Sequence, residues 1–369
     1  MSDWSDWVAA QLAQVEAAGQ WRTPIPFDGS LCAMLHGREV INFAANDYLG
    51  LGFHPEVAAA AGEAIARWGT GAGAARLVTG TRSLHAELEA AIAAWRRAAR
   101  ALVFPTGYAA NIGVLTTLGA ADVTIFSDAL NHASIIDGCR LSKARTVVFA
   151  HNDVAHLERL MRATPGRKLV VTEAVFSMDG DAAPLRDLAR VCASMGALLI
   201  VDEAHAVLAP DVDGIDCECL RVGTLSKTLG ALGGWVAGAK PTIDLLVNRA
   251  RTFIFTTALS PPDTAAALAA LNIYRSEEGE RLRDRLRRHV DTLQPGHPSP
   301  IVPIVLGSEA AALAAARALL DHGIHIPAIR PPTVPKGTSR LRLTLSAAHS
   351  DEMIARLQAA LDAVLASAR

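Results

Sequence analysis

The chain has 369 residues, of which 51% are hydrophobic and 20% are charged, and its formal net charge is −2. This size and composition predict a large α/β domain with a sizeable core and a smaller unit attached to it. The near balance of charge argues against a nucleic-acid partner, and the lack of any run of about eighteen apolar residues argues against a membrane span.

The cysteine pattern and the amino-terminal segment point to one cellular compartment. The five cysteines are scattered and odd in number, which is typical of reduced thiols, and Cys217-Glu-Cys219 lacks the spacing and the partner pair of a zinc site. The first seven residues are acidic and include no apolar run like that of a signal peptide. We therefore expect a cytoplasmic protein without a metal site.

The predicted elements begin with an amphipathic helix over residues 3–18 and a short strand near 40–44. From residue 55 to 240, short apolar runs alternate with helical segments such as 83–97 and 184–195. This alternation predicts a mainly parallel central sheet with helices on both faces. The apolar runs that we interpret as buried strands are 101–104, 123–126, 146–149, 169–172 and 197–201.

The last third of the chain predicts a different arrangement. A helical stretch over 261–293 ends at a segment rich in proline and glycine, and a strand, a helix, a second strand and a last helix follow. This order predicts a small C-terminal α+β domain. We expect four parts: 1–50 as an amino-terminal helix and strand segment, 51–260 as the large cofactor-binding domain, 261–294 as a connecting helical stretch and 295–369 as the small domain.

Asp202 and His205 directly follow the apolar run 197–201. Ligands of open α/β sheets bind at the carboxyl ends of strands, and a carboxylate there can hold a pyridine nitrogen in its protonated form. The alternative is a solvated acid that ends a strand. The pair Asp202-Glu203 also resembles the acidic end of an ATPase motif, but no glycine-rich lysine loop accompanies it.

Lys227 is the single charged residue of the segment 222–238. Burial favours the neutral amine of a lysine, and that amine can form an imine with an aldehyde cofactor. The hydroxyl of the nearby Thr224 is suited to contact a phosphate. Together with Asp202, this lysine outlines a site for pyridoxal 5'-phosphate (PLP), in which the acid tunes the cofactor as an electron sink.

Three further motifs fit such a site. Gly107 and Tyr108 follow a strand and open a helix, whose positive end can bind a phosphate; the alternative is an ordinary strand-to-helix turn. His132 follows the strand 123–126 and can stack on a ring, or serve structure alone. Arg340 and Arg342 alternate with leucines and share one strand face, where a guanidinium can bind a carboxylate or form a surface ion pair.

Eight motifs in this order resemble the α-oxoamine synthases over nearly the whole chain. These are fold-type I PLP enzymes that condense an amino acid with an acyl thioester and release carbon dioxide. The motifs are Asn46-Asp-Tyr-Leu-Gly50, Thr106-Gly-Tyr-Ala-Ala-Asn111, Asn131-His-Ala-Ser134, His151-Asn-Asp-Val154, Val175-Phe-Ser-Met-Asp-Gly-Asp181, Val201-Asp-Glu-Ala-His205, Thr224-Leu-Ser-Lys227 and Phe255-Thr-Thr257. The family usually has glycine where Ala206 follows His205, and the loop 207–219 looks short.

The resemblance implies a role for each matching residue. Lys227 would carry the cofactor, Asp202 would pair its ring nitrogen, His205 its phenolic oxygen, and His132 would stack on the ring. The remaining cofactor contacts would come from Gly107, Tyr108, Ser177 and Thr224, and from Thr256 and Thr257 of a neighbouring subunit, so the family implies a homodimer. The substrate site would include Arg342, which binds the carboxylate of the amino acid, together with Arg22, Asn46, His132, Arg330 and Thr333.

The segment 328–349 resembles one branch of the family most closely. That branch implies L-alanine and a pimeloyl thioester as substrates, with coenzyme A or an acyl-carrier protein as the acyl carrier. Other members of the family use a different amino acid, and one methyl group separates glycine from alanine. Another alternative is a non-catalytic partner subunit that keeps the fold.

Overall fold

The computed structural model describes residues 3–35, 37–209 and 217–366, so most of the loop 207–219 lies outside the described residues. The chain divides into two compact units. Unit 1 comprises Met1–Ala44, Pro303–Leu343 and Ala355–Arg369, and unit 2 comprises Ala45–Val302 and Thr344–Ile354. The amino-terminal segment thus groups with most of the C-terminal part of the chain.

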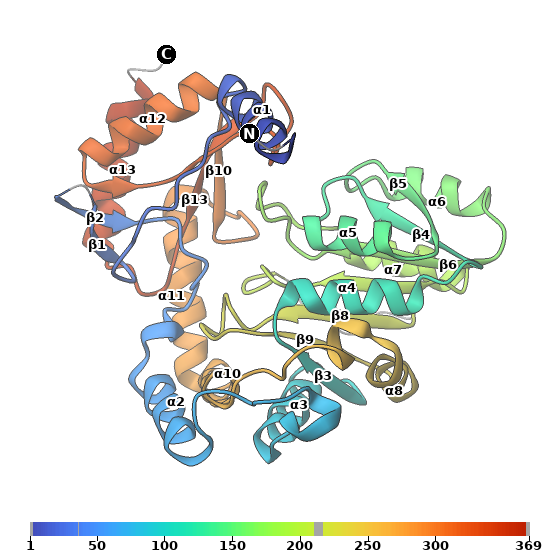
Figure 1. Ribbon diagram of the computed structural model, residues 1–369. Coiled ribbons are helices and arrows are strands. Elements are labelled where there is room, and N and C mark those ends of the chain that lie inside the picture. The colour runs from blue at the N-terminus through green and yellow to red at the C-terminus, as the bar shows by residue number, and fades with distance from the viewer. Residues whose placement is uncertain (1–2, 36, 210–216, 367–369) are drawn as a thin grey trace. The chain divides into compact units, whose positions relative to one another are not determined.

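The described residues of unit 2 are built around a seven-stranded sheet with the order β3-β9-β8-β7-β6-β4-β5 (Figure 1). Neighbouring strands from β8 to β5 pair in parallel, whereas β9 runs antiparallel to both β8 and β3. The predicted mainly parallel sheet is therefore confirmed. The strands are β3 (Arg100–Phe104), β4 (Val123–Asp128), β5 (Arg145–Phe149), β6 (Arg167–Glu173), β7 (Leu198–Asp202), β8 (Cys219–Thr224) and β9 (Gly234–Gly238).

Successive residues of the central strands enter two separate cores, because side chains of a strand alternate between the faces of the sheet. On β7, Ile200 belongs to one core, and its neighbours Leu199 and Val201 belong to the other. The first core packs against α4 (Gly107–Leu118), α5 (Ala133–Leu141), α8 (Lys240–Arg249) and α9 (Arg251–Ile254). The second packs against α6 (Val154–Arg162) and α7 (Leu185–Ser194), so helices cover both faces.

The remaining helices of unit 2 include the predicted helical stretch 261–293, which consists of two helices. α10 (Pro261–Tyr274) ends before Ser276, whose side chain accepts a hydrogen bond from Gly279 N and so begins α11 (Glu277–Leu293). The others are α2 (Pro55–Trp68), α3 (Ser83–Trp95), a 3-10 turn over Leu51–Phe53 and a π-helical turn over Arg76–Gly80.

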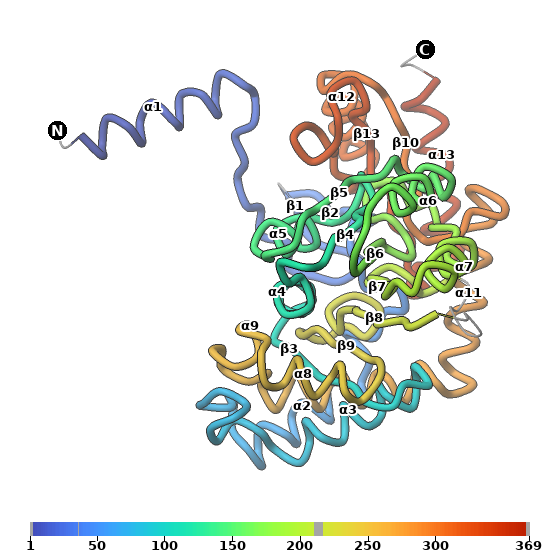
Figure 2. The backbone as a smooth tube through the Cα atoms, turned by 90° about the vertical axis from the view of Figure 1, so that its right-hand side faces the viewer, coloured from blue at the N-terminus to red at the C-terminus, as the bar shows by residue number. Residues whose placement is uncertain are grey.

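The described residues of unit 1 contain two small sheets. One has the order β1 (Cys32–Leu35), β2 (Arg38–Asn42) and β11 (Ile324–His325). The other has the order β10 (Ile301–Gly307), β13 (Ser339–Thr344) and β12 (Ala328–Ile329), and all of its residues except Ile301, Val302 and Thr344 belong to unit 1. α12 (Glu309–Asp321) and most of α13 (Asp351–Ala366) belong to this unit. The predicted amino-terminal helix is α1 (Asp3–Ala17); it buries no residue and stands away from the strands of its unit in Figure 2.

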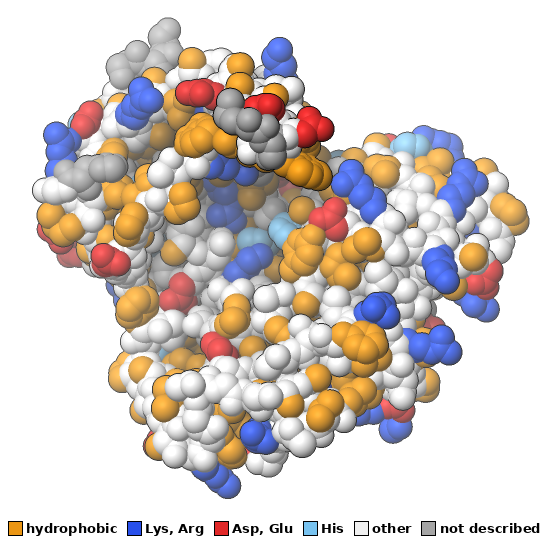
Figure 3. Space-filling model, in the orientation of Figure 1, with side chains coloured by type: hydrophobic (Ala, Val, Ile, Leu, Met, Phe, Trp, Pro, Cys, Tyr) orange, Lys and Arg blue, Asp and Glu red, His pale blue; other side chains and the backbone are white. Residues whose placement is uncertain are grey.

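The surface carries both basic and acidic side chains, as the small net charge of the chain leads one to expect. On the face that Figure 3 shows, basic and acidic side chains are interspersed, and hydrophobic side chains are exposed among them. None of the five cysteines forms a disulfide. Within the described residues, no helix combines the length and the apolar character that a membrane crossing requires.

Candidate active site

A cavity of about 250 Å³ lies in unit 2 at the edge of the sheet where β6, β7 and β8 end. Parallel strands place their carboxyl ends at the same edge, so residues far apart in sequence meet there. Seven of the predicted site residues line this cavity. The lining residues are Thr106, Gly107, Tyr108, Asn111, His132, Ser134, Glu173, Asp202, Ala204, His205, Gly223, Thr224, Ser226, Lys227 and Leu232.

Asp202 is the last residue of β7, and its buried carboxylate is held by two donors. Asn111 Nδ2 donates to Asp202 Oδ2 at 2.7 Å, and the backbone N–H of Ala204 donates to Asp202 Oδ1 at 2.9 Å. These bonds fix the orientation of the carboxylate. The polar chain continues, because Asn111 Nδ2 also donates to Ser134 Oγ at 2.9 Å.

Glu173 occupies the equivalent position on the neighbouring strand, because the register of β6 and β7 pairs Glu173 with Asp202. Its side chain is 2% exposed, and Oε1 has no hydrogen-bond partner. Burial, and then the negative charge of Asp202, raise the pKa of Glu173 well above its usual range; the charge of Lys227 and the backbone N–H groups of His132 and Ser177 oppose this. Burial therefore favours the neutral form of the Glu173 carboxyl group next to Asp202.

Glu203 follows Asp202 and forms ion pairs outside this cavity. Its Oε1 lies 2.5 Å from Arg221 Nε, and its Oε2 lies 3.1 Å from Arg96 NH2, with all three side chains largely buried. The guanidinium of Arg96 in turn lies over the ring of Trp95, 3.5 Å from its centroid. Two consecutive carboxylates therefore have different partners: one faces the cavity, and the other neutralises two arginines.

Lys227 lies in the turn between β8 and β9, and its amine contacts His205. Lys227 Nζ is 2.7 Å from His205 Nε2, and Tyr48 Oη is 2.5 Å from His205 Nδ1. Within this turn, Gly230 has φ +62°, and a Cβ added there would lie 2.3 Å from Gly52 N. The backbone at Gly230 thus lies so close to the backbone at Gly52 that a residue with a side chain would clash there, and glycine is required.

His132 is the N-cap residue of α5. Its Nδ1 accepts a hydrogen bond from Ser134 N at 3.2 Å and lies 2.8 Å from Ser134 Oγ. Burial is the main cause that lowers the pKa of His132, with the charge of Lys227 acting in the same direction, while Asp202 opposes it. A neutral imidazole fixed in this way presents a flat ring to the cavity, which suits stacking on an aromatic ligand.

The N-terminus of α4 supplies a second feature of the cavity. Thr106 caps this helix by accepting a hydrogen bond from Ala109 N, and a Cβ added to Gly107 would lie 3.2 Å from Thr224 Cβ. Thr224 Oγ1 donates to Gly233 O at 2.9 Å and contacts Ser226 Oγ at 2.7 Å. Unpaired N–H groups at a helix start, next to hydroxyls, form a suitable site for a phosphate.

Four other predicted residues of unit 2 lie outside the lining of the cavity. The backbone N–H of Ser177 donates a hydrogen bond to the carboxyl group of Glu173, which lines the cavity. Asn46 Oδ1 accepts a hydrogen bond from the hydroxyl of Tyr48 at 3.2 Å, and Tyr48 in turn contacts His205 in the cavity. Thr257 forms an isolated β-bridge with Ala75. Thr256 and Thr257 are absent from the residues that line the cavity in this chain.

The other predicted substrate residues belong to unit 1. Arg342 is buried on β13, and Arg330 donates from NH1 to Gly19 O at 3.0 Å. Thr333 N donates to Arg330 O at 3.0 Å. Arg22 is exposed and borders a shallow pocket of about 440 Å³ that is also lined by Leu12, Val15, Gln20, Trp21 and Pro332.

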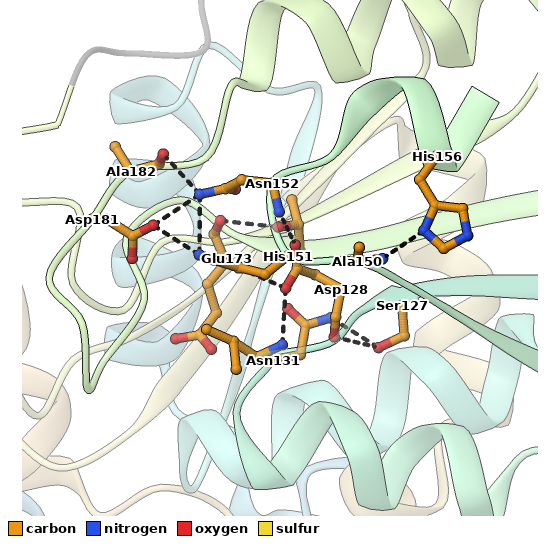
Figure 4. A network of polar contacts seen from close by, with 12 residues as sticks. Ser127, Asp128, Asn131, Ala150, His151, Asn152, His156, Glu173, Asp181 and Ala182 are labelled. Atoms are coloured by element: carbon orange, nitrogen blue, oxygen red, sulfur yellow. Dashed lines mark hydrogen bonds and ion pairs between the residues drawn. The ribbon is translucent and has the colours of Figure 1, made fainter. Parts of the chain in front are cut away.

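Figure 4 shows a polar network centred on His151, which lies between two aspartates. His151 Nδ1 is 2.9 Å from Asp128 Oδ1, and His151 Nε2 is 2.8 Å from Asp181 Oδ2. Asp128 also accepts from the backbone of Leu130, two residues before His132, and Asp181 ends the segment that carries Ser177. The network therefore ties together two loops that flank the candidate site.

We predict that the His151 network makes stability depend on pH. Burial lowers the pKa of His151, but hydrogen bonds and charge attraction from Asp128 and Asp181 outweigh it and raise the pKa from 6.5 to about 10. A raised pKa stabilises the fold fully below about pH 6.5, and this stabilisation is lost as the pH rises towards 10. Denaturant unfolding should show a fall in stability over that window, of about 1–3 kcal/mol after solvent screening is allowed for.

The variant His151→Gln should show a smaller fall over the same pH range. His322→Gln removes an exposed histidine that follows α12 and serves as the matched control. An identical decline in His151→Gln and in the original protein would contradict the assigned role of the network.

Sequence reasoning missed Glu173, Asn111, Ser134 and Tyr48 as members of the site. Glu173 carried a signal, because it directly follows an apolar run just as Asp202 does. The other three lie in motifs of the predicted site, but nothing in their spacing indicates that they hydrogen-bond to Asp202, His132 and His205.

The residues of the cavity fit pyridoxal 5'-phosphate. Lys227 offers an amine for the aldehyde, Asp202 offers a fixed carboxylate for the ring nitrogen, and the start of α4 suits the phosphate. This sheet with such a site defines a fold-type I PLP-dependent enzyme. The chain belongs to the aminotransferase class I and II family, whose model matches residues 38–361.

Comparison with curated proteins and solved structures shows which members of this enzyme class the chain is similar to in sequence and fold. The 8-amino-7-oxononanoate synthase of Anaeromyxobacter dehalogenans strain 2CP-1 is 50% identical over 98% of this chain and 96% of its own length. The serine palmitoyltransferase structure of Sphingomonas wittichii matches with a TM-score of 0.90 and 32% identity, over 100% of this chain and 98% of that one. Further serine palmitoyltransferase structures that contain PLP are 32% and 31% identical.

A solved 8-amino-7-oxononanoate synthase of Francisella tularensis matches with a TM-score of 0.74 and 26% identity, over 89% of this chain and 97% of that one. The resemblance to the α-oxoamine synthases that the sequence motifs indicated is thereby confirmed. The predicted fold class and the predicted cofactor are confirmed with it.

Proposed function

We propose that the protein catalyses the reaction of an 8-amino-7-oxononanoate synthase. L-alanine and a pimeloyl thioester would give 8-amino-7-oxononanoate, carbon dioxide and the free thiol of the acyl carrier, in a step of biotin biosynthesis. The observation that carries the proposal is the 50% identity over nearly the full length to a synthase of that name. The convergence of Lys227, Asp202, His205 and His132 on one cavity supports it.

When bound, PLP supplies an aldehyde for amine exchange and an electron sink for the carbanion and for the decarboxylation. The amine of Lys227 would take the proton from Cα of alanine and return a proton to the product. The carboxylate of Asp202 would hold a proton on the ring nitrogen, because Asn111 and Ala204 keep that carboxylate oriented. His132 would stack on the ring, and His205 would hydrogen-bond its phenolic oxygen.

Further contacts are proposed from the family pattern. Gly107, Tyr108, Ser177 and Thr224 would contact the phosphate or nearby cofactor atoms, with Thr256 and Thr257 contributed by a second subunit. Arg342 would bind the carboxylate of alanine, because a guanidinium pairs with a carboxylate through two parallel hydrogen bonds. Arg22, Asn46, Arg330 and Thr333 complete the proposed substrate contacts.

The substrates are tested by offering glycine, L-alanine and L-serine with acetyl, succinyl, palmitoyl and pimeloyl thioesters. Pimeloyl groups are supplied both on coenzyme A and on acyl-carrier protein, and the products are identified by mass spectrometry. We expect alanine with pimeloyl thioester to be preferred, with a kcat/KM about 10–200-fold higher than that for glycine, the range that one methyl group allows.

Exclusive use of glycine or serine would instead assign the chain to glycine C-acetyltransferase, 5-aminolaevulinate synthase or serine palmitoyltransferase. No turnover with any pair would favour a non-catalytic partner subunit.

We also propose a cytoplasmic homodimer in which each active site draws residues from both chains. The Ala75–Thr257 bridge brings two segments together, and their neighbours Leu77, Val78 and Phe255 are exposed, Phe255 to 69%. Exposed apolar side chains gathered in this way are typical of an interface. Sedimentation should give twice the chain mass of 38.8 kDa, and a fully active monomer would refute the shared site.

A further inference from the structure

Tyr48 links the amino-terminal motif Asn46-Asp-Tyr-Leu-Gly50 to the amine of the candidate site. Its side chain is completely buried, and its ring lies 6.0 Å from the ring of His205. The backbone is anchored as well, because Tyr48 O accepts from Ala347 N at 2.8 Å. The hydroxyl is therefore held in place between Asn46 Oδ1 at 3.2 Å and His205 Nδ1 at 2.5 Å.

The direction of each hydrogen bond in this chain follows from the number of protons available. A tyrosine hydroxyl has one proton, and the carbonyl oxygen of an asparagine can only accept. The Tyr48 proton therefore points to Asn46, and the Tyr48 oxygen accepts from His205 Nδ1–H. In a neutral imidazole Nε2 then carries no proton, and it accepts from the Lys227 ammonium group at 2.7 Å.

We propose that Tyr48 is a positioning residue for His205. Its hydroxyl, turned by Asn46, keeps the histidine proton on Nδ1 and so presents Nε2 to Lys227 as a proton acceptor. The inference rests on the proposed function where it concerns PLP, because only an aldehyde gives the amine of Lys227 something to react with.

The proton transfer that this arrangement permits is balanced within the two side chains. An N–H bond of the Lys227 ammonium group breaks, and an N–H bond forms on His205 Nε2. The electron pair remains on Nζ and becomes available to attack an aldehyde carbon. The positive charge moves to the imidazolium, whose Nδ1–H still donates to the Tyr48 oxygen, so no buried donor loses its acceptor.

The test uses the full-length, cofactor-free chain with 15N-labelled histidine. NMR distinguishes a protonated from an unprotonated ring nitrogen, and His205→Asn identifies the signals. We expect His205 to carry its proton on Nδ1. Tyr48→Phe should move it towards Nε2, because Nδ1–H loses its acceptor, and Lys227 would then accept from Nε2–H as a neutral amine. Tyr274→Phe removes the hydroxyl of a ring that packs on Trp95 and Arg283, and it should leave the His205 signals unchanged.

Two substitutions of Asn46 keep the proposal testable if Tyr48→Phe folds poorly. Asn46→Ala removes the acceptor, so the Tyr48 proton should turn to His205 Nδ1 and the histidine proton should appear on Nε2. Asn46→Asp keeps an oxygen that can only accept, so the original arrangement should persist. A His205 signal that is the same in all these variants would overturn the proposal.

The second readout is the rate at which PLP is incorporated into the cofactor-free chain, followed by absorbance. The loss of one hydrogen bond should slow incorporation by about 3–10-fold in Tyr48→Phe. An unchanged rate with a changed His205 signal would overturn the proposed link to Lys227. Failure of the original protein to bind PLP would instead contradict the proposed function, and the NMR result on the cofactor-free chain would stand independently.

Discussion

Replacement of Lys227 by alanine should abolish covalent attachment of PLP and reduce turnover by about 10³-fold or more. The side chain is both the amine that the aldehyde needs and the proposed base for Cα, so one substitution removes two functions. Attachment is measured as the mass added to the intact protein after reduction with borohydride, and turnover is measured with alanine and pimeloyl thioester.

The control for this experiment is Lys240→Ala. Lys240 is an exposed lysine at the start of α8, where it pairs with Asp244 at 2.6 Å. This variant should keep both the attached mass and the turnover. If Lys227→Ala retained the attached mass at the level of the original protein, another lysine would carry the cofactor, and the assignment of the site would fail.

Asp202→Asn should preserve the fold and lower kcat by about 10²–10³-fold. The amide keeps the shape of the side chain, but it removes the negative charge that would hold the ring nitrogen protonated. Circular dichroism monitors the fold, and steady-state kinetics give kcat separately from KM. We expect most of the loss in kcat, because the charge acts on the carbanion rather than on substrate binding.

Glu173→Gln provides the matched control on the neighbouring strand. Burial and the charge of Asp202 raise the pKa of Glu173, so its carboxyl is expected to be neutral, and a neutral amide of the same size should change kcat by less than about threefold. Equal losses in the two variants would mean that Glu173 is charged in the working enzyme, and that Asp202 does not act alone at the ring nitrogen.

The sequence predicted the sheet well where strands are fully apolar. β4, β6 and β7 contain predicted apolar runs, because a parallel strand covered on both faces has no polar side to interrupt its pattern. β5 also contains its predicted run, but it is the edge strand of the sheet and only Phe149 is buried, so the expectation of a buried strand there was wrong. β8 and β9 were missed. β8 includes the buried Arg221, whose charge is neutralised by Glu203, and β9 begins and ends with glycine. Only the folded neighbours explain why such segments become strands.

The sequence also predicted only part of the candidate site, namely those residues that contrast with their neighbours in the sequence. Lys227, Asp202 and His205 stand out because their chemistry contrasts with the apolar or uncharged residues around them. Tyr48 and Asn111 do not, since a hydroxyl or an amide is common in any loop. Their importance depends on distances to His205 and Asp202 across more than 90 residues of sequence, which only the fold determines.

The buried ion pairs of Glu203 have a consequence for how the strands assemble. Neighbouring residues of a strand point to opposite faces, so a slip of one position in β7 would send Glu203 to the cofactor side and Asp202 to the arginines. The shorter aspartate would then meet two guanidinium groups that it cannot bridge as glutamate does, and burial of an unmatched charge is costly. We therefore expect the ion pairs of Arg96 and Arg221 with Glu203 to disfavour the shifted register of β7.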